Sequence, residues 1–124
     1  MRRSSGFTLI ELLVVMSIIS LLSAVAVPQF MQYRIRGFDA RAKADLYNVA
    51  TAEEAYYADY ELYIPCNQSN CVALLPAIKG LPSHGVQLQI SITSATASNF
   101  TGSSKHVTSA VTFLWDSSHG GLQP

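Results

Sequence analysis

Glu11 is the residue of the amino-terminal segment whose chemistry is hardest to accommodate, because it places a carboxylate inside an apolar run from Phe7 to Val27. As an α-helix with a rise of about 1.5 Å per residue, that run would span roughly 30 Å, the hydrocarbon thickness of a bilayer. A carboxylate within such a segment costs a few kcal/mol even on lenient insertion scales. The sequence therefore indicates that Glu11 has a partner.

The residues around Glu11 form a recognisable motif. Two arginines precede Gly6, Phe7 follows it, the glutamate stands at the fifth position after Gly6, and the apolar run ends just before Pro28. This pattern resembles the type IV prepilin signature, which is shared by pilins and by the pseudopilins of type II secretion. The resemblance is dense from Gly6 to about Tyr63, nearly half of the chain.

The resemblance implies roles for the matching positions. A prepilin peptidase would cut after Gly6, and the new amino terminus of Phe7 would be N-methylated. Glu11 would then face the positive amine of Phe7 on a neighbouring subunit during filament assembly. Two charges that are each costly in an apolar core cost less as a pair. From the residues themselves, no cofactor, no catalytic residue and no metal ligand is expected.

Two other readings of the apolar run fit less well. A secretory signal peptide has a shorter apolar stretch and an Ala-x-Ala cleavage site. The nearest match here is residues 23–26, Ser-Ala-Val-Ala. A plain signal-anchored membrane protein would give Glu11 no role.

Charge and composition limit the partners of the chain. Removal of Arg2 and Arg3 with a six-residue leader would take the eight basic side chains down to six, against eight acidic ones. A mildly acidic mature chain argues against nonspecific nucleic-acid binding, so no nucleic-acid partner is expected. The leader arginines are expected to stay cytoplasmic, which would place the carboxyl-terminal part outside the cytoplasm.

Cys66 and Cys71 are the only cysteines. In an oxidising compartment they are expected to form a disulfide, and closing so short a loop contributes about 2 kcal/mol in the chain-entropy account. The alternative, a metal site with two thiolates, lacks further histidine or cysteine ligands nearby.

The helix is predicted to continue beyond the membrane. An apolar stripe runs along its second half at helical spacing, with charged residues mostly opposite. The stripe is made of Phe38, Ala42, Leu46, Val49, Tyr56 and Tyr60, and the opposite face of Arg41, Asp45, Asn48 and Asp59. Glu53 projects into the stripe, as a snorkelling position or a subunit contact. Pro28 removes one backbone hydrogen bond and is predicted to kink or loosen the helix.

A small sheet is predicted after the helix. Residues 72–78 suggest a short helical turn, and Val86–Thr93 alternates as a half-buried strand does. A second strand is expected over Val107–Trp115. Phe100 would anchor a third, weaker strand before a turn at Thr101–Ser104.

The predicted class is α+β and pilin-like: a long amino-terminal helix, membrane-spanning in its first half and amphipathic in its second, packed on a small antiparallel sheet. The expected segments are a leader (1–6), a transmembrane or filament-core helix (7–29), its amphipathic continuation (30–62) and a small globular domain (63–124).

No enzyme is expected. His84, His106 and His119 have no carboxylates spaced as partners, and histidines in such loops are usually only solvated. The adjacency of Ser118 and His119 is not the geometry of a base that activates a hydroxyl. Secretion pseudopilins typically bind calcium near the carboxyl terminus, commonly through several carboxylates. The corresponding stretch of this chain offers only one carboxylate, Asp116, with hydroxyls and carbonyls nearby. The shortage of carboxylates counts against a calcium-stabilised pseudopilin without excluding a calcium-free one.

The function expected from the resemblance is that of a structural subunit of a type IV pilus-like filament. The partners would be identical subunits, a prepilin peptidase, an inner-membrane assembly platform and, before assembly, the inner membrane itself. The alternatives are a pseudopilin that drives type II secretion and a minor pilin that binds DNA or surfaces. The aromatic-rich helix is also similar to helices for which electron conduction has been proposed, but the preferred interpretation of its aromatics is packing in the core and at interfaces.

Overall fold

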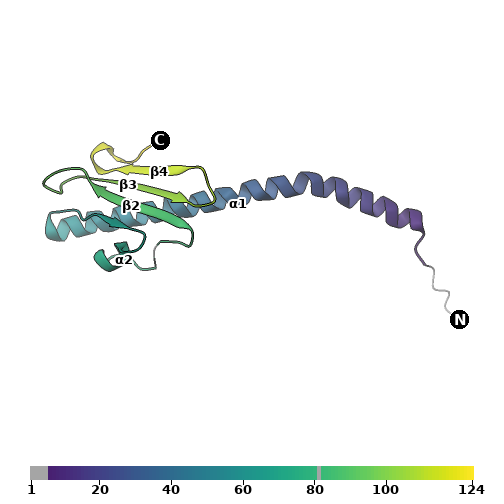
Figure 1. Ribbon diagram of the computed structural model, residues 1–124, viewed down its shortest axis with the longest axis horizontal. Helices are drawn as coiled ribbons and strands as arrows, with labels where there is room; N and C mark the ends of the chain where they lie inside the picture. Colours follow the sequence, from purple (N-terminus) through teal and green to yellow (C-terminus); the bar gives the residue numbers. More distant parts are fainter. Residues whose placement is uncertain (1–5, 81) are drawn as a thin grey trace. The chain divides into compact units, whose positions relative to one another are not determined.

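The computed structural model describes residues 6–80 and 82–124; Arg2, Arg3 and the rest of the expected leader before Gly6 lie outside the described residues. A single long helix, α1, runs from Leu9 to Tyr60 and includes Pro28. The contacts of the chain define two units, one up to Arg34 and one from Ile35 to Pro124. Figure 1 shows the elements of both.

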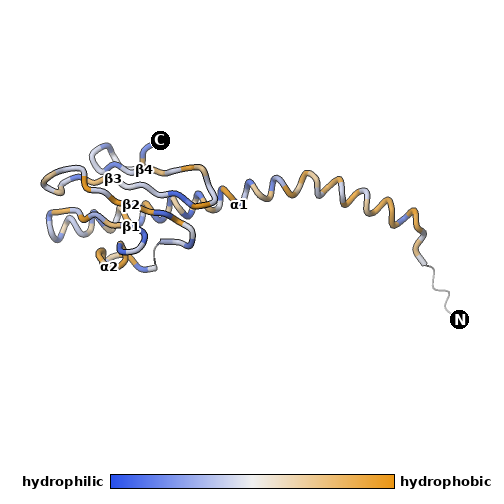
Figure 2. The backbone as a smooth tube through the Cα atoms, in the orientation of Figure 1, coloured by the Kyte–Doolittle hydropathy of each residue, from blue (hydrophilic) through white to orange (hydrophobic). Residues whose placement is uncertain are grey.

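The first unit consists of the apolar part of α1. Hydrophobic residues predominate along it, as Figure 2 shows, and its described side chains are exposed. Among the described residues, α1 is the one helix that is long and apolar enough to cross a membrane. An apolar surface of this length is not stable in water, so lipid or other protein must cover it.

The second unit contains a five-stranded sheet in the order β1-β2-β3-β4-β5, and every neighbouring pair is antiparallel. Its elements are β1 (Cys66–Asn67), α2 (Cys71–Leu74), β2 (Val86–Ile92), β3 (Phe100–His106), β4 (Thr112–Asp116), the 3₁₀ turn η1 (Ser117–His119) and β5 (Gly121–Leu122). The predicted α+β class and the strand at residues 86–92 are confirmed.

The second half of α1 packs antiparallel along β3, at the centre of the sheet. Phe38 stacks on the His106 ring, with centroids 4.1 Å apart. One turn further along α1, the Ala42 carbonyl accepts a 2.8 Å hydrogen bond from the Ser104 hydroxyl. Four residues of helix rise about 6 Å and two residues of strand about 6.6 Å, so one helical turn matches one inward-facing strand position.

The close packing of helix and strand depends on Gly102, the next inward position of β3. A Cβ atom on Gly102 would lie 2.9 Å from the terminal methyl carbons of both Leu46 and Ile90. Both of those side chains are fully buried. Glycine at this position therefore lets a helix and a neighbouring strand pack against the same point of the core.

Two predictions about this sheet are wrong. Residues 101–104 are not a turn, because they form the middle of β3, with Phe100, Gly102, Ser104 and His106 facing inward. Small residues suggested a turn, whereas here they make room for α1. The strand expected over Val107–Trp115 begins only at Thr112, because Val107 starts the turn between β3 and β4.

The apolar stripe of α1 is confirmed at its centre and wrong near its end. Ala42, Leu46 and Val49 are buried, whereas Tyr60 is 60% exposed. Asp45, expected on the opposite face, is buried as well. Its carboxylate accepts hydrogen bonds from the backbone N–H and the hydroxyl of Ser83, at 2.6 and 3.1 Å, and so anchors the segment before β2.

Candidate processing and assembly site

Glu11 and Thr8 form a reciprocal cap at the start of α1. The Thr8 N–H and hydroxyl donate to Oε2 of Glu11 at 2.8 and 2.7 Å, and the Glu11 N–H donates to the Thr8 hydroxyl at 3.3 Å. These bonds satisfy amides that have no partner within the helix, as in a capping box. The spacing Thr-x-x-Glu carried this signal in the sequence, but the carboxylate was interpreted there only as a partner for an amine.

The residues expected at the cleavage position lie just before this cap. Gly6 and Phe7 are exposed and precede the first helical residue, Leu9. A Cβ on Gly6 would meet no atom within 4 Å, so the folded chain itself does not require glycine there. The roles of Gly6 and Phe7 in cleavage and N-methylation stay predictions, as does the pairing of Glu11 with the amine.

Pro28 lies within α1, and the helix is assigned on both sides of it. Proline has no N–H to donate to the preceding turn, so one backbone hydrogen bond is missing here. A kink or local loosening at Pro28 stays a prediction.

Cys66 and Cys71 form the disulfide, with their Cα atoms 4.9 Å apart. The bridge joins β1 to the start of α2, and both cysteines are buried in the core. It therefore fixes the short loop that follows the chain reversal after α1.

Glu53 lies beside this bridge and is fully buried. Its Oε2 accepts a 3.1 Å hydrogen bond from the Ile64 N–H, and its Oε1 lies 4.0 Å from the Cys66 sulfur. Burial, the largest effect, raises the pKa of Glu53 from 4.5 to about 7, while the bond from Ile64 acts in the opposite direction and the nearby Glu54 charge adds to the rise. Its position in the apolar stripe is confirmed, and its role is to hold the returning chain rather than to snorkel.

Tyr63 completes this region. It stacks on Tyr57 and contacts the Phe100 ring, and its hydroxyl donates a 2.9 Å hydrogen bond to Glu54. Burial and the Glu54 carboxylate both raise the Tyr63 pKa. Burial keeps the phenol neutral, so the contact with Glu54 is a hydrogen bond rather than part of a catalytic pair.

The turn η1 brings Asp116, Ser118 and His119 together, but not as a catalytic triad. Nδ1 of His119 contacts both Oδ2 of Asp116, at 2.8 Å, and the Ser118 hydroxyl, at 2.9 Å. A base that activates a hydroxyl uses one ring nitrogen for the hydroxyl and the other for the carboxylate. Asp116 instead caps the turn through the Ser118 N–H and hydroxyl, and these bonds, followed by His119, lower its pKa.

His106 departs from the expectation of a solvated histidine. Its ring is buried against Phe38, and its Nδ1 accepts a 3.2 Å hydrogen bond from the Thr108 N–H. The signal that could have revealed this was its place at an inward position of a strand. His84 and His119 are exposed, as expected. The prediction that His119 has no carboxylate partner is wrong, because Oδ2 of Asp116 lies 2.8 Å from its Nδ1.

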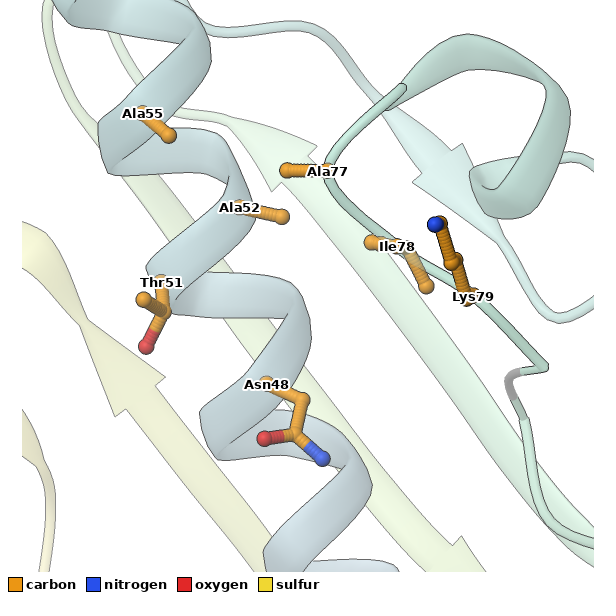
Figure 3. Close-up of a pocket in the computed structure, with 7 residues that line it drawn as sticks. All are labelled: Asn48, Thr51, Ala52, Ala55, Ala77, Ile78 and Lys79. Atoms are coloured by element: carbon orange, nitrogen blue, oxygen red, sulfur yellow. The ribbon is translucent and has the colours of Figure 1, made fainter.

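A groove of about 350 Å³ lies between α1 and the segment after α2, as Figure 3 shows. Its lining consists of Asn48, Thr51, Ala52, Ala55, Ala77, Ile78 and Lys79. Small side chains shape it, and its one charged group is Lys79. This lining offers no acid–base pair and no activated nucleophile.

Comparison with known sequences gives the same assignment as the motif. The profile of the prokaryotic N-terminal methylation motif matches residues 1–27. The type IV wide pilus major component PilA4 of Thermus thermophilus is 37% identical over 100 residues, which cover 81% of this chain and 72% of that protein.

Two further relatives represent both branches of the resemblance. The type IV major pilin PilE of Neisseria gonorrhoeae is 31% identical over 110 residues, 89% of this chain and 65% of its own length. The type II secretion system core protein G of Pseudomonas aeruginosa is 38% identical over 81 residues, 65% of this chain and 56% of that protein. A match to the type IV major pilin PilA of Myxococcus xanthus spans only 28% of that relative's length. The chain belongs to the family of type IV pilins and type II secretion pseudopilins, whose members are structural proteins and not enzymes.

Proposed function

We propose that this chain is a structural subunit that polymerises into a type IV pilus-like filament after a prepilin peptidase cuts between Gly6 and Phe7. The observation on which the proposal depends is the exposed apolar surface of α1, which needs lipid before assembly and other subunits after it. Several relatives are named as major pilins, and these names support the same role.

The subunit would begin as a single-pass protein of the inner membrane, with its carboxyl-terminal part outside the cytoplasm. An assembly platform in that membrane would then transfer it into an extracellular or periplasmic filament. The buried disulfide supports a non-cytoplasmic location, because disulfides persist in oxidising compartments.

Glu11 would pair with the N-methylated amine of Phe7 on the neighbouring subunit. The geometry leaves room for this pairing, because both bonds from Thr8 end on the same carboxylate oxygen, Oε2. The second oxygen, Oε1, can accept from an incoming amine without loss of the cap. An amine left unpaired in an apolar core is costly, so the pair would favour the correct docking of each new subunit.

The test separates the charge of Glu11 from its capping role. Glu11→Gln keeps a side-chain oxygen for the Thr8 N–H, whereas Glu11→Val loses both charge and cap. We expect both variants to insert and to be cleaved, and both to give little sheared filament relative to processed subunit, with Glu11→Val the more severe. Thr8→Val, which removes the hydroxyl of the cap and keeps the charge, is the control and should still assemble.

Wild-type filament yield from Glu11→Val would show that the carboxylate is not an assembly contact. If Thr8→Val lowers the filament yield as much as Glu11→Gln does, the defect comes from loss of the cap and not from loss of the charge.

The second candidate function is that of a pseudopilin in type II secretion, which the 38% identity to core protein G favours. A deletion strain distinguishes the two. Loss of surface pili with normal protein export supports the pilus, whereas normal pili with a lost exported protein would support the pseudopilus.

A further inference from the structure

Glu53 and the Cys66–Cys71 disulfide form a buried cluster in the second unit. Glu53 is fully buried, and the two cysteines are 2% and 1% exposed. The disulfide joins β1 to α2, whereas Glu53 lies on α1, so the cluster connects three elements. A titratable group and a redox-active group that share one buried site influence each other strongly, because the low polarity of the surroundings strengthens their interaction.

The two carboxyl oxygens of Glu53 have different partners. Oε2 accepts a 3.1 Å hydrogen bond from the backbone N–H of Ile64, whereas Oε1 lies 4.0 Å from the Cys66 sulfur and, within the described residues, has no other hydrogen-bonding partner. A protonated carboxyl accepts through its carbonyl oxygen and carries its proton on the other oxygen. The bond from Ile64 therefore marks Oε2 as the carbonyl oxygen and places the proton on Oε1, which faces Cys66.

The groups around Glu53 favour its neutral form. Glu54, the next residue of α1, adds a negative charge nearby. The returning chain contributes the phenol of Tyr63, whose pKa burial raises further, and the two cysteines of the disulfide do not titrate. Glu53 forms no ion pair with any described residue. Burial thus raises the Glu53 pKa to about 7 with no cation to oppose the rise.

Reduction of the disulfide changes what Oε1 faces. In the disulfide, the Cys66 sulfur has no proton and can only accept a hydrogen bond. In the dithiol form the same sulfur carries an S–H group, which is a weak donor. A hydrogen bond donated to a carboxylate favours the charged form. Glu53 is therefore expected to ionise more readily when Cys66 is a thiol than when it is part of the disulfide.

We propose that Glu53 exchanges a proton with the Cys66 sulfur when the disulfide is reduced or formed. On reduction, two molecules of a small thiol supply two electrons that break the S–S bond, and they leave joined as a disulfide. The Cys66 sulfur takes the proton from Oε1 of Glu53, the Cys71 sulfur takes one of the two thiol protons, and the other is released to water. Oxidation by a small disulfide reverses each step.

The coupling has a definite sign. Because the disulfide form of the chain holds one more proton on Glu53 than the dithiol form does, low pH favours the disulfide. As the pH rises toward the range in which Glu53 ionises in both forms, the disulfide becomes easier to reduce. This device acts within the second unit and does not depend on filament assembly.

The first test measures the equilibrium of the full chain, in a mild detergent, with the thiol and disulfide forms of glutathione. Between pH 5.5 and 7.5 the thiols stay protonated, so without coupling the equilibrium constant for disulfide formation is independent of pH. We expect this constant to fall about fourfold over that range in the wild type, as one weak hydrogen bond to a charged group implies. The fall should persist in Glu54→Gln and be absent in Glu53→Gln. A flat wild-type constant, or the same fall in Glu53→Gln, would overturn the proposal.

The second test identifies the donor. Carbon NMR of the full chain with labelled glutamate carboxyls follows the titration of Glu53, and Trp115 fluorescence checks that each form is folded. Cys66→Ser combined with Cys71→Ala keeps a donor beside Oε1, whereas Cys66→Ala combined with Cys71→Ala removes it. Glu53 should titrate at a lower pH in the dithiol form and the serine variant than in the disulfide form and the alanine variant.

Two results of the second test would contradict the exchange of a proton with Cys66. Equal titration of Glu53 in the serine and alanine variants would show that the donor at position 66 has no effect on the carboxyl. Loss of the native Trp115 fluorescence on reduction would show that no folded chain brings the thiol to Glu53.

Discussion

The buried carboxyl of Glu53 makes the stability of the second unit depend on pH. Its pKa is raised from 4.5 to about 7, so the folded chain holds a proton that the unfolded chain releases above pH 4.5. The free energy of unfolding therefore falls as the pH rises from 4.5 to about 7, and the loss is complete above that range. A rise of the Glu53 pKa by about 2.5 lowers the free energy of unfolding at high pH by about 3 kcal/mol.

Glu53→Gln should remove this dependence. The amide oxygen can still accept the Ile64 N–H, and the side chain stays neutral at every pH. We therefore expect the variant to unfold with nearly the same free energy at pH 5 and pH 8, and to be the more stable protein at pH 8. Glu54→Gln, which changes the exposed neighbour, should keep most of the wild-type slope.

The assay is urea unfolding of the full chain in a mild detergent, followed by Trp115 fluorescence between pH 4 and pH 8.5. The histidines are the same in all three proteins, so the difference between the slopes of the wild type and Glu53→Gln isolates Glu53. A wild-type slope indistinguishable from that of Glu53→Gln would refute the reasoning, because it would mean that the carboxyl is hydrated and ionises normally in the folded chain.

Three further predictions concern other parts of the chain. Gly102→Ala should destabilise the second unit by about 1–3 kcal/mol in the same assay, because its Cβ forces Leu46 and Ile90 apart; an unchanged midpoint would show that the core can relax. Replacing Cys66 and Cys71 with serine should cost about 2 kcal/mol, and a wild-type midpoint for that double variant would contradict the loop-entropy account. Changing Gly6 to a bulky residue should leave uncleaved precursor in the membrane on immunoblots, without loss of folding, and normal processing would argue against the motif.

Patterns within single elements allowed much of this fold to be predicted from sequence. Helical spacing found the buried stripe at Ala42, Leu46 and Val49, and alternation found β2. The compartment and spacing of the cysteines gave the disulfide. These features depend on residues close in the chain.

Features that depend on contact between elements were missed. The residues Thr101–Ser104 do not by themselves predict a strand. Their small size fits the close packing of α1 against β3, which the local sequence does not reveal. Asp45 is polar and helical spacing placed it outside, yet two bonds from Ser83, distant in sequence, compensate its burial. The cap at Glu11 was missed for another reason: one carboxylate can serve two roles, and the motif drew attention to only one.

The matched spacing of α1 and β3 has a consequence for how the gene can change in length. An insertion of one residue between Phe38 and Leu46 would turn every later residue of α1 by about 100° and remove the partners of Ser104 and Gly102. The segment 93–99 between β2 and β3 carries no such constraint on length, although the Thr93 N–H donates to the Asn99 carbonyl and the Ala97 carbonyl accepts from the Tyr63 N–H. Insertions and deletions should therefore accumulate in that loop and be purged from the helix, so that an alignment of relatives would show a gap-free block through residue 50 followed by variable connections.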